Sequence, residues 1–162
     1  MLILGIDPGL DGALALVRGP ELLAVHDLPS EPTGGSGTVK RRLAAGMLAA
    51  LLHDVLAGHY RNEALVVIEY VSAGSGQGVA SSFAFGDTAG CLRGVVQTLG
   101  LRIEYATPAQ WKRAMRVPAD KSTARTIAAA RWPAQAGLFA RVKDHNRAEA
   151  SLLAAHGWER FA

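Results

Sequence analysis

Apolar runs separated by turn residues open the chain. Residues 2–7 read LILGID, and the turn-forming stretch PGLDG comes before a second apolar run at 13–17. A third run, at 21–28, follows Gly19 and Pro20. Short apolar runs joined by Gly and Pro are typical of strands connected by tight turns. The pattern predicts a three-stranded antiparallel meander over the first 28 residues.

Residues 29–71 contain a polar stretch, then apolar residues at helical spacing, and then a continuous apolar run. Residues 29–37 have no apolar period, which predicts a loop, whereas 39–56 have apolar residues at helical spacing, with three basic residues at 40–42 in the expected first turn. Residues 64–71, ALVVIEYV, form the continuous β-branched run that is typical of a central strand buried on both faces. After a glycine-rich loop, residues 79–99 are expected to form a helix.

The pattern then continues with one strand and further helices. Residues 101–106 alternate like a strand, and Thr107-Pro108 is expected to begin the next helix. Asp120 or Ser122 is expected to cap the helix at 123–132. The order of elements predicts one α/β domain over residues 1–162, with a mixed five-stranded sheet flanked by helices.

The last helix, expected from about His145 to Trp158, contains a charged residue among Ala and Leu. An ionised carboxylate in apolar surroundings is costly unless it has a partner, so Glu149 requires one. Asp144 is expected at the N-cap of this helix. On an ideal helix, several residues share the face of Glu149, namely His145, Leu152, Leu153 and His156.

Charge is unevenly distributed along the chain. Residues 1–92 have 5 Lys and Arg against 9 Asp and Glu, a balance of −4, and residues 93–162 have 12 against 5, a balance of +7. A basic half suits a polyanion such as nucleic acid, although scattered basic residues can also simply solvate helices.

The lone Cys91 can form no internal disulfide, which favours a reducing cytoplasm. Asp7 and Asp11 interrupt the first apolar residues, so we expect no signal peptide or membrane anchor.

Asp7 and Glu69 occupy similar places near the ends of two apolar strands. If these strands are adjacent and parallel, both carboxylates emerge at one edge of the sheet, where α/β sheets bind ligands. Such a pair repels unless a cation lies between the two, and oxygen ligands suit Mg²⁺ or Mn²⁺. Packing of the last helix on the sheet would bring Glu149 to the same edge. Asp7 could instead act only as a turn former.

Several motifs together resemble the RuvC family of Holliday-junction resolvases, in particular its phage-like branch. These motifs are LGIDPGLDGALALV, LVVIEYV, GLRIEYATPAQWKRAM, ADKSTA and HNRAEASLLAAHG. They occur in the same order as in the family, and the similarity covers nearly the whole chain. The resemblance implies a ribonuclease H-like fold, usually in a homodimer, that nicks branched DNA with two divalent metal ions. It implies metal binding by Asp7, Glu69 and Glu149, and a phosphate contact by Lys121.

The sequence departs from this family at two places. The family has a second acid or a histidine three residues before the last acid, where this chain has Asn146, so the fourth ligand is either His145 or Asp144. Helical geometry favours His145. An aromatic residue that follows the strand acid by three places in relatives is replaced by Ser72. One of three other residues, Tyr70, Phe83 or Phe85, is then the candidate for the aromatic contact with the junction. The alternative is that this chain has no such contact.

Two other classes of function fit parts of the sequence. The imperfect last motif is compatible with a module that binds branched DNA without cutting it. The GIDPG strand and turn also begin sugar kinases and actin-like ATPases, but those proteins need a second nucleotide-binding lobe, for which this chain has no room.

Overall fold

A five-stranded sheet with the strand order β3-β2-β1-β6-β7 forms the centre of the protein. The computed structural model describes residues 1–34, 40–70, 72, 78–118 and 121–162, without the side chains of 121 and 122. The strands are β1 (Leu2–Asp7), β2 (Ala13–Arg18), β3 (Glu21–Asp27), β6 (Ala64–Glu69) and β7 (Arg102–Ala106). The first three pair antiparallel, and β6 and β7 run parallel to β1. The predicted mixed five-stranded sheet is confirmed.

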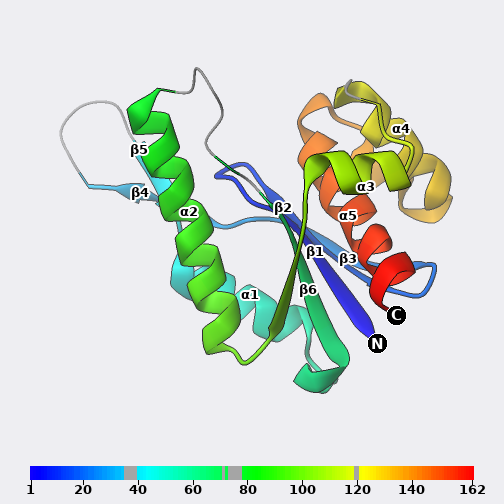
Figure 1. Cartoon of the computed structure of the whole chain (residues 1–162), viewed down its shortest axis with the longest axis horizontal. Coiled ribbons are helices and arrows are strands. Elements are labelled where there is room, and N and C mark those ends of the chain that lie inside the picture. Colours follow the sequence, from blue (N-terminus) through cyan, green and yellow to red (C-terminus); the bar gives the residue numbers. More distant parts are fainter. Residues whose placement is uncertain (35–39, 71, 73–77, 119–120) are drawn as a thin grey trace.

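Helices cover both faces of this sheet (Figure 1). On one face lie α1 (Ala45–Val55) and α2 (Val79–Thr98), and on the other α3 (Pro108–Ala114), α4 (Lys121–Arg131) and α5 (His145–Phe161). Three short 3-10 helices join them, η1 (Arg61–Glu63), η2 (Pro133–Phe139) and η3 (Val142–Asp144). Strands β1 and β6 are buried on both sides, with Leu4 in the core beneath α1 and α2 and Ile3 in the core beneath α5. Two apolar cores therefore hold the sheet between the layers.

Helix α5 crosses β1 at very short range, and two glycines make this possible. A Cβ atom at Gly5 would overlap the backbone of Ala150 and Ala154 on α5. A Cβ atom at Gly157 would come within 2.6 Å of Val67 Cγ2 on β6. Only a residue without a side chain allows such an approach. The crossing fixes α5, and with it Glu149, directly above β1.

A two-stranded sheet replaces part of the predicted loop and helix. Strand β4 (Ser30–Thr33) pairs with β5 (Lys40–Leu43), so the predicted loop at 29–37 and the helical start at 39 are wrong for these residues. The basic residues at 40–42 lie on β5 and not in a first helical turn. Cross-strand charge pairing supports this hairpin, since Arg42 faces Glu31 in the register and donates to it at 2.8 Å. Helix α1 begins only after Leu43.

The observed N-termini of the helices agree only in part with the caps predicted from the sequence. Thr107 caps α3 as predicted, with its hydroxyl accepting from the backbone N of Gln110 at 3.3 Å and the Gln110 side chain accepting in return from the backbone N of Thr107. Ser122 lies inside α4, which begins at Lys121, so it is not a cap. Asp120 lies outside the described residues. Among the described helices, none has the length and apolar character that a membrane crossing requires.

Candidate active site

Asp7 and Glu69 are the last residues of two neighbouring parallel strands. The register pairs Ile6 with Ile68, so both carboxylates come one position later at the same edge of the sheet. Residues directly opposite each other on parallel strands point to the same face. The residues in phase with these two acids belong to the core beneath α5. Both acids therefore lie on the side of the sheet that α5 covers.

Glu149 approaches this edge from the second turn of α5. Its side chain is only 13% exposed, and Lys112 Nζ on α3 donates to its Oε1 atom at 2.9 Å. The charge that appeared costly in the sequence is thus balanced by a partly buried ammonium group. The capped start of α3 follows directly from β7, and this places Lys112 over the same sheet edge.

Glu69 is held by a neighbouring residue of α3. The indole Nε1 of the buried Trp111 donates to Glu69 Oε1 at 2.8 Å. Burial raises the pKa of the Glu69 carboxyl, and the Trp111 hydrogen bond lowers it. Glu149 raises the same pKa, and Lys112 lowers it. Glu69 and Glu149 are therefore close enough to repel one another, which is the situation that a bound cation relieves.

The donor set fits a hard divalent cation. Asp7, Glu69 and Glu149 offer carboxylate oxygens at one sheet edge, and the described residues include no zinc-type cluster of Cys and His. In the part of the chain that the structure describes, no three acidic, His or Cys side chains converge closely enough to hold an ion as they stand. Glu149 binds Lys112 and Glu69 binds Trp111 instead. Metal binding would require Glu149 to exchange its ammonium partner for the ion.

Asp144 occupies the N-cap position of α5 but does not cap the helix. Its carboxylate, 2% exposed, accepts from Arg141 Nη2 at 2.8 Å and from the Arg141 backbone N at 2.8 Å. These bonds and the charge of Arg141 hold the pKa of Asp144 below its ordinary value. Arg147 adds a weaker contact at 3.9 Å. The predicted N-cap position is confirmed, but the side chain makes no capping hydrogen bond because Arg141, three residues earlier, binds the carboxylate.

His145 lines a separate polar cavity beside the start of α5. The cavity has a volume of about 370 Å³ and is also lined by Asp11, Asp27 and Arg41. The His145 Nδ1 atom lies 3.1 Å from the backbone oxygen of Val142. His145 is one helical turn before Glu149, so both residues lie on the same face of α5.

The start of α5 is tied to the sheet by Asn146 and Arg147, for which the sequence predicted no such contacts. Asn146, at the position of the missing family acid, donates from Nδ2 to the backbone oxygen of Asp11 in the β1–β2 turn. Arg147 makes two hydrogen bonds of 2.6 Å to the carboxylate of Asp27 at the end of β3. These contacts orient the first turn of α5 and thereby Glu149.

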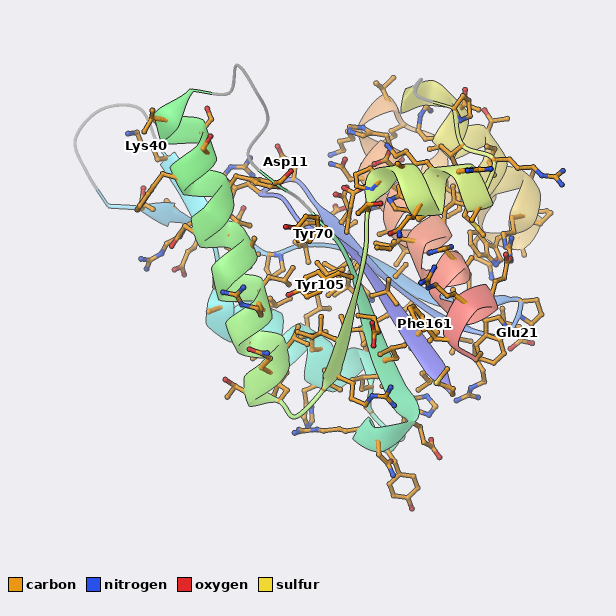
Figure 2. All side chains as sticks on the ribbon, viewed as in Figure 1. Asp11, Glu21, Lys40, Tyr70, Tyr105 and Phe161 are labelled. Carbon is orange, nitrogen blue, oxygen red and sulfur yellow. The ribbon has the colours of Figure 1, made fainter. Side chains whose placement is uncertain are left out.

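The remaining predicted residues are partly described. Lys121 is the first residue of α4, and its side chain lies outside the described part of the structure. Of the three candidate aromatic residues, Phe83 is 77% exposed and Tyr70 52% exposed, and Phe85 is half-buried. Figure 2 shows Tyr70 beside Tyr105, between α2 and the sheet.

Lys112 and Trp111 are the site residues that the sequence reasoning missed. Both belong to the stretch ATPAQWKRAM, which predicts a capped helix and forms part of the family resemblance but gave these two residues no role. A signal was present, since a helix capped at the end of a parallel strand begins at the edge where Glu69 lies. A Lys in the second turn of such a helix is a candidate partner for a carboxylate at that edge.

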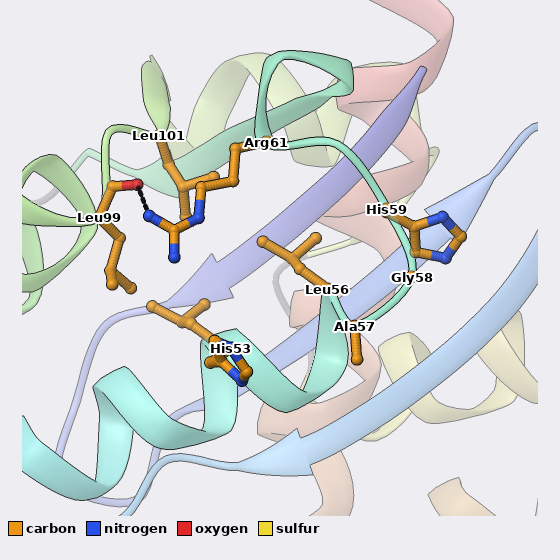
Figure 3. Close-up of a pocket in the computed structure, with 9 residues that line it drawn as sticks. His53, Leu56, Ala57, Gly58, His59, Arg61, Leu99 and Leu101 are labelled. Carbon is orange, nitrogen blue, oxygen red and sulfur yellow. Dashed lines mark hydrogen bonds between the residues drawn. The ribbon is translucent and has the colours of Figure 1, made fainter.

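A cavity at the opposite end of the sheet has a different character. It has a volume of about 270 Å³ and lies between the end of α1 and the start of β7 (Figure 3). Arg61 Nη1 donates to the backbone oxygen of Leu99 at 2.8 Å at its rim. This cavity is lined mainly by leucines and contains no carboxylate, so it offers none of the chemistry of the other edge.

The fold is that of the ribonuclease H-like RuvC resolvases. Thermus thermophilus RuvC shares 19% identity with this chain, with 98% of this chain and 96% of that chain covered and a TM-score of 0.55. A structure of T. thermophilus RuvC in complex with a Holliday junction substrate shares 16% identity, with 99% and 96% covered and a TM-score of 0.56. No family model matches the chain. No curated protein matches it either. The resemblance seen in the sequence is confirmed at the level of the fold.

Proposed function

We propose that this protein is a divalent-metal-dependent endonuclease that nicks four-way DNA junctions during recombination and repair. The observation that carries the proposal is that Asp7 and Glu69 end two neighbouring parallel strands, with Glu149 close to Glu69 on the helix that crosses β1. A solved protein with the same fold binds a Holliday junction. Three carboxylates at the edge of such a sheet favour hydrolysis of a phosphodiester bond.

The residues of the site have separate roles in this proposal. Asp7, Glu69 and Glu149 would hold two Mg²⁺ or Mn²⁺ ions, which when bound activate a water and stabilise the leaving oxygen. Trp111 fixes the orientation of Glu69 through its 2.8 Å hydrogen bond. Lys112 orients Glu149 through its 2.9 Å hydrogen bond, and its ammonium group would be available to contact the phosphate. Lys121 is proposed as a second basic contact with the scissile phosphate.

We propose His145, and not Asp144, as the fourth ligand. Arg141 already binds both carboxylate oxygens of Asp144. The Asp144 side chain is also nearly fully buried. His145 is half-buried and lies one helical turn before Glu149 on the same face of α5.

The proposed partners are a branched DNA and a second copy of the chain. Residues 93–162, with a balance of +7, would neutralise phosphates along the arms of a junction. The single Cys91 supports a cytoplasmic location. A homodimer would supply two sites for the two cuts that resolve a junction.

A cleavage assay on a synthetic four-way junction tests the function. We expect nicks near the crossover with Mg²⁺ or Mn²⁺, little cutting of linear duplex, and a loss of at least about a hundredfold in rate for Glu69→Gln and Glu149→Gln. His145→Ala should lose more activity than Asp144→Asn. Junction cleavage that survives Glu69→Gln would overturn the site. Tight junction binding without product at any metal concentration would select the non-cleaving binding module.

A further inference from the structure

The cavity at the end of the sheet remote from the carboxylates has a floor of leucines (Figure 3). Leu52, Leu56 and Leu101 belong to the core beneath α1 and α2, and Leu99 is half-buried at the rim. The volume of about 270 Å³ is below the range of about 300–1,000 Å³ that is usual for small-molecule sites. The cavity therefore suits one or two side chains of a partner better than a cofactor or a nucleotide.

Two tight turns hold the walls of this cavity in place. One turn follows α1 and contains Gly58 at φ +80°, and the other follows α2 and contains Gly100 at φ +73°. Such angles are readily adopted only by glycine. The backbone N of His59 donates to the oxygen of Leu56 at 3.0 Å, and that of Gly100 donates to the oxygen of Gln97 at 2.9 Å. A ligand would enter a site that is already formed, which lowers the entropic cost of binding.

Arg61 adds a positive charge at the rim of the leucine floor. Its Nη1 atom donates at 2.8 Å to the backbone oxygen of Leu99, the C-cap residue of α2. This bond satisfies a carbonyl at the helix end and thus explains one N–H group of the guanidinium. Within the described part of the chain, Arg61 makes no ion pair and no other hydrogen bond, so its remaining N–H groups are available to a ligand. A guanidinium with free N–H groups is well suited to bind a carboxylate.

The other polar residues at the rim are also basic. His53 is exposed and His59 is half-buried, and Arg18 Nη2 lies 3.1 Å from His59 Nδ1. The acidic residue that follows His53 in α1, Asp54, is not among the residues that line the cavity, and none of those is acidic. An apolar floor with a basic rim is complementary to a ligand that carries a negative charge next to a bulky apolar group.

We propose that this cavity binds the C-terminal residue of a partner protein, with its apolar side chain on the leucines and its carboxylate on Arg61. A C-terminal residue carries both groups on one Cα atom, which suits a guanidinium placed directly at the rim of an apolar cavity. Acidic residues just before that C-terminus would be attracted by Arg18. The proposal does not depend on the endonuclease function.

A partner bound in this cavity would leave the carboxylate edge of the sheet accessible. Strand β6 begins at Ala64, three residues after Arg61, and ends at Glu69. At about 3.3 Å per residue, the two ends of this strand are roughly 17 Å apart. The cavity would therefore hold a second protein while the other edge binds its own ligand.

Fluorescence anisotropy with synthetic peptides tests the site on the full-length protein. The probes are four fluorescein-labelled peptides that end in Asp-Asp-Leu followed by Leu, Ile, Met or Phe with a free carboxylate. The comparison peptides have a C-terminal amide, or Ser as the last residue. We expect the wild type to bind at least one probe about tenfold or more tightly than its comparison peptides. Equal binding of acid and amide, or no saturable binding of any probe at up to about 1 mM, overturns the proposal.

Substitutions of Arg61 test the contact with the carboxylate. Arg61→Met keeps the apolar stem and should bind the acid and the amide peptide equally weakly, whereas Arg61→Lys should keep part of the preference for the acid. Arg102→Met is the matched control, since it removes an exposed arginine at the start of β7 that does not line the cavity. If Arg61→Met binds both peptides less tightly but keeps the full preference for the acid, the role of Arg61 is only structural and the proposal fails.

A second variant tests the cavity by filling it. Ala57 is exposed and lines the cavity, so Ala57→Phe should weaken binding of the probe at least about tenfold without disturbing the core. Ala134→Phe adds the same ring at an exposed position of η2 and should bind the probe normally. In the wild type, the probe should shift the NMR amide resonances of Gly58 and Gly100 and leave that of Gly5 in place. Normal binding by Ala57→Phe overturns the proposal.

Two further results would assign the cavity to a different ligand and overturn the proposal. Displacement of the probe by a four-way junction in EDTA would assign Arg61 to DNA phosphates. A change of oligomeric state in Ala57→Phe would assign the cavity to a contact between copies of this chain. A failure of junction cleavage with retained peptide binding would overturn only the endonuclease function.

Discussion

The ion pair between Lys112 and Glu149 stabilises the protein in the absence of metal. The two side chains are 28% and 13% exposed, so solvent screens their interaction only in part. We expect Lys112→Met to lower the free energy of unfolding by about 1 kcal/mol in EDTA, because it leaves Glu149 without its cation. Urea denaturation measures this loss.

A matched pair of variants separates this charge effect from packing. Glu149→Gln in the Lys112→Met background should recover most of the loss, since the amide carries no charge. An equal loss in the single and the double variant would contradict the assignment of Lys112 as the partner of Glu149.

His156 makes stability depend on pH. It is 6% exposed, its Nε2 atom has no hydrogen-bond partner among the described residues, and burial lowers its pKa from the ordinary 6.5. The neighbouring Arg160 lowers this pKa further, and Glu159 opposes that shift. Because the unfolded chain binds the proton more readily, His156 costs no stability above about pH 6.5 and an increasing amount as the pH falls below it.

We therefore expect His156→Leu to gain stability relative to the wild type as the pH falls from about 7.5 to 5.5. Thermal unfolding at several pH values measures the difference. The control is His53→Leu, which also removes an imidazole but changes a side chain that is 68% exposed. Parallel profiles for His156→Leu and the wild type would contradict the prediction.

The sequence predicted the placement of Glu149 but not the local partners of the acids. Apolar periodicity and strand order were enough to bring Asp7, Glu69 and Glu149 to one side of the sheet. The partners of Asp144 and Glu149 are set by side-chain geometry, which periodicity does not contain. Asp144 accepts hydrogen bonds from Arg141 and makes no capping hydrogen bond to the helix. Lys112, which donates to Glu149, belongs to a different helix.

At the level of elements, the crossing of α5 over β1 depends on Gly5. A methyl group at this position would overlap the backbone of Ala150 and Ala154, which cannot move without displacing the helix. We expect Gly5→Ala to destabilise the protein by roughly 3 kcal/mol or more, and to reduce any activity that requires Glu149. Urea denaturation checks the first effect.

Gly46→Ala is the matched control for this substitution. Gly46 lies in α1, and a Cβ atom there would meet nothing within 4 Å. Alanine favours a helix over glycine by up to about 1 kcal/mol, so this variant should be as stable as the wild type or more stable. Similar losses for both variants would contradict the role of Gly5.

The β4–β5 hairpin marks the limit of sequence patterns at this scale. The central strands were predicted because short apolar runs rich in β-branched residues or bounded by turn residues favour a strand over a buried helix. Strand β5 has one buried residue, Leu43, and three exposed basic ones. Its strand form depends on pairing with Glu31 and its neighbours across the hairpin, a contact that is not local in the sequence.

For the molecule as a whole, one candidate site lies at one sheet edge, whereas a four-way junction is resolved by two cuts. Under the proposed function, the second site would come from a second copy of the chain. A suitable surface lies between α1 and α2, where a groove of about 330 Å³ is lined by small and apolar residues that include Ala49, Cys91 and Gly94. A Cβ atom at Gly94 would meet nothing within 4 Å in the same chain.

We expect the wild type to be a dimer that Gly94→Leu dissociates. In a two-fold interface each substitution occurs twice, so the added side chains would block close approach and raise the dissociation constant at least about tenfold. Sedimentation equilibrium measures it. Gly137→Leu places the same side chain on the exposed η2 segment, where there is also open space, and should leave the dimer intact. A wild type that stays monomeric at every concentration would remove the second site, and the chain could then make only one nick per encounter.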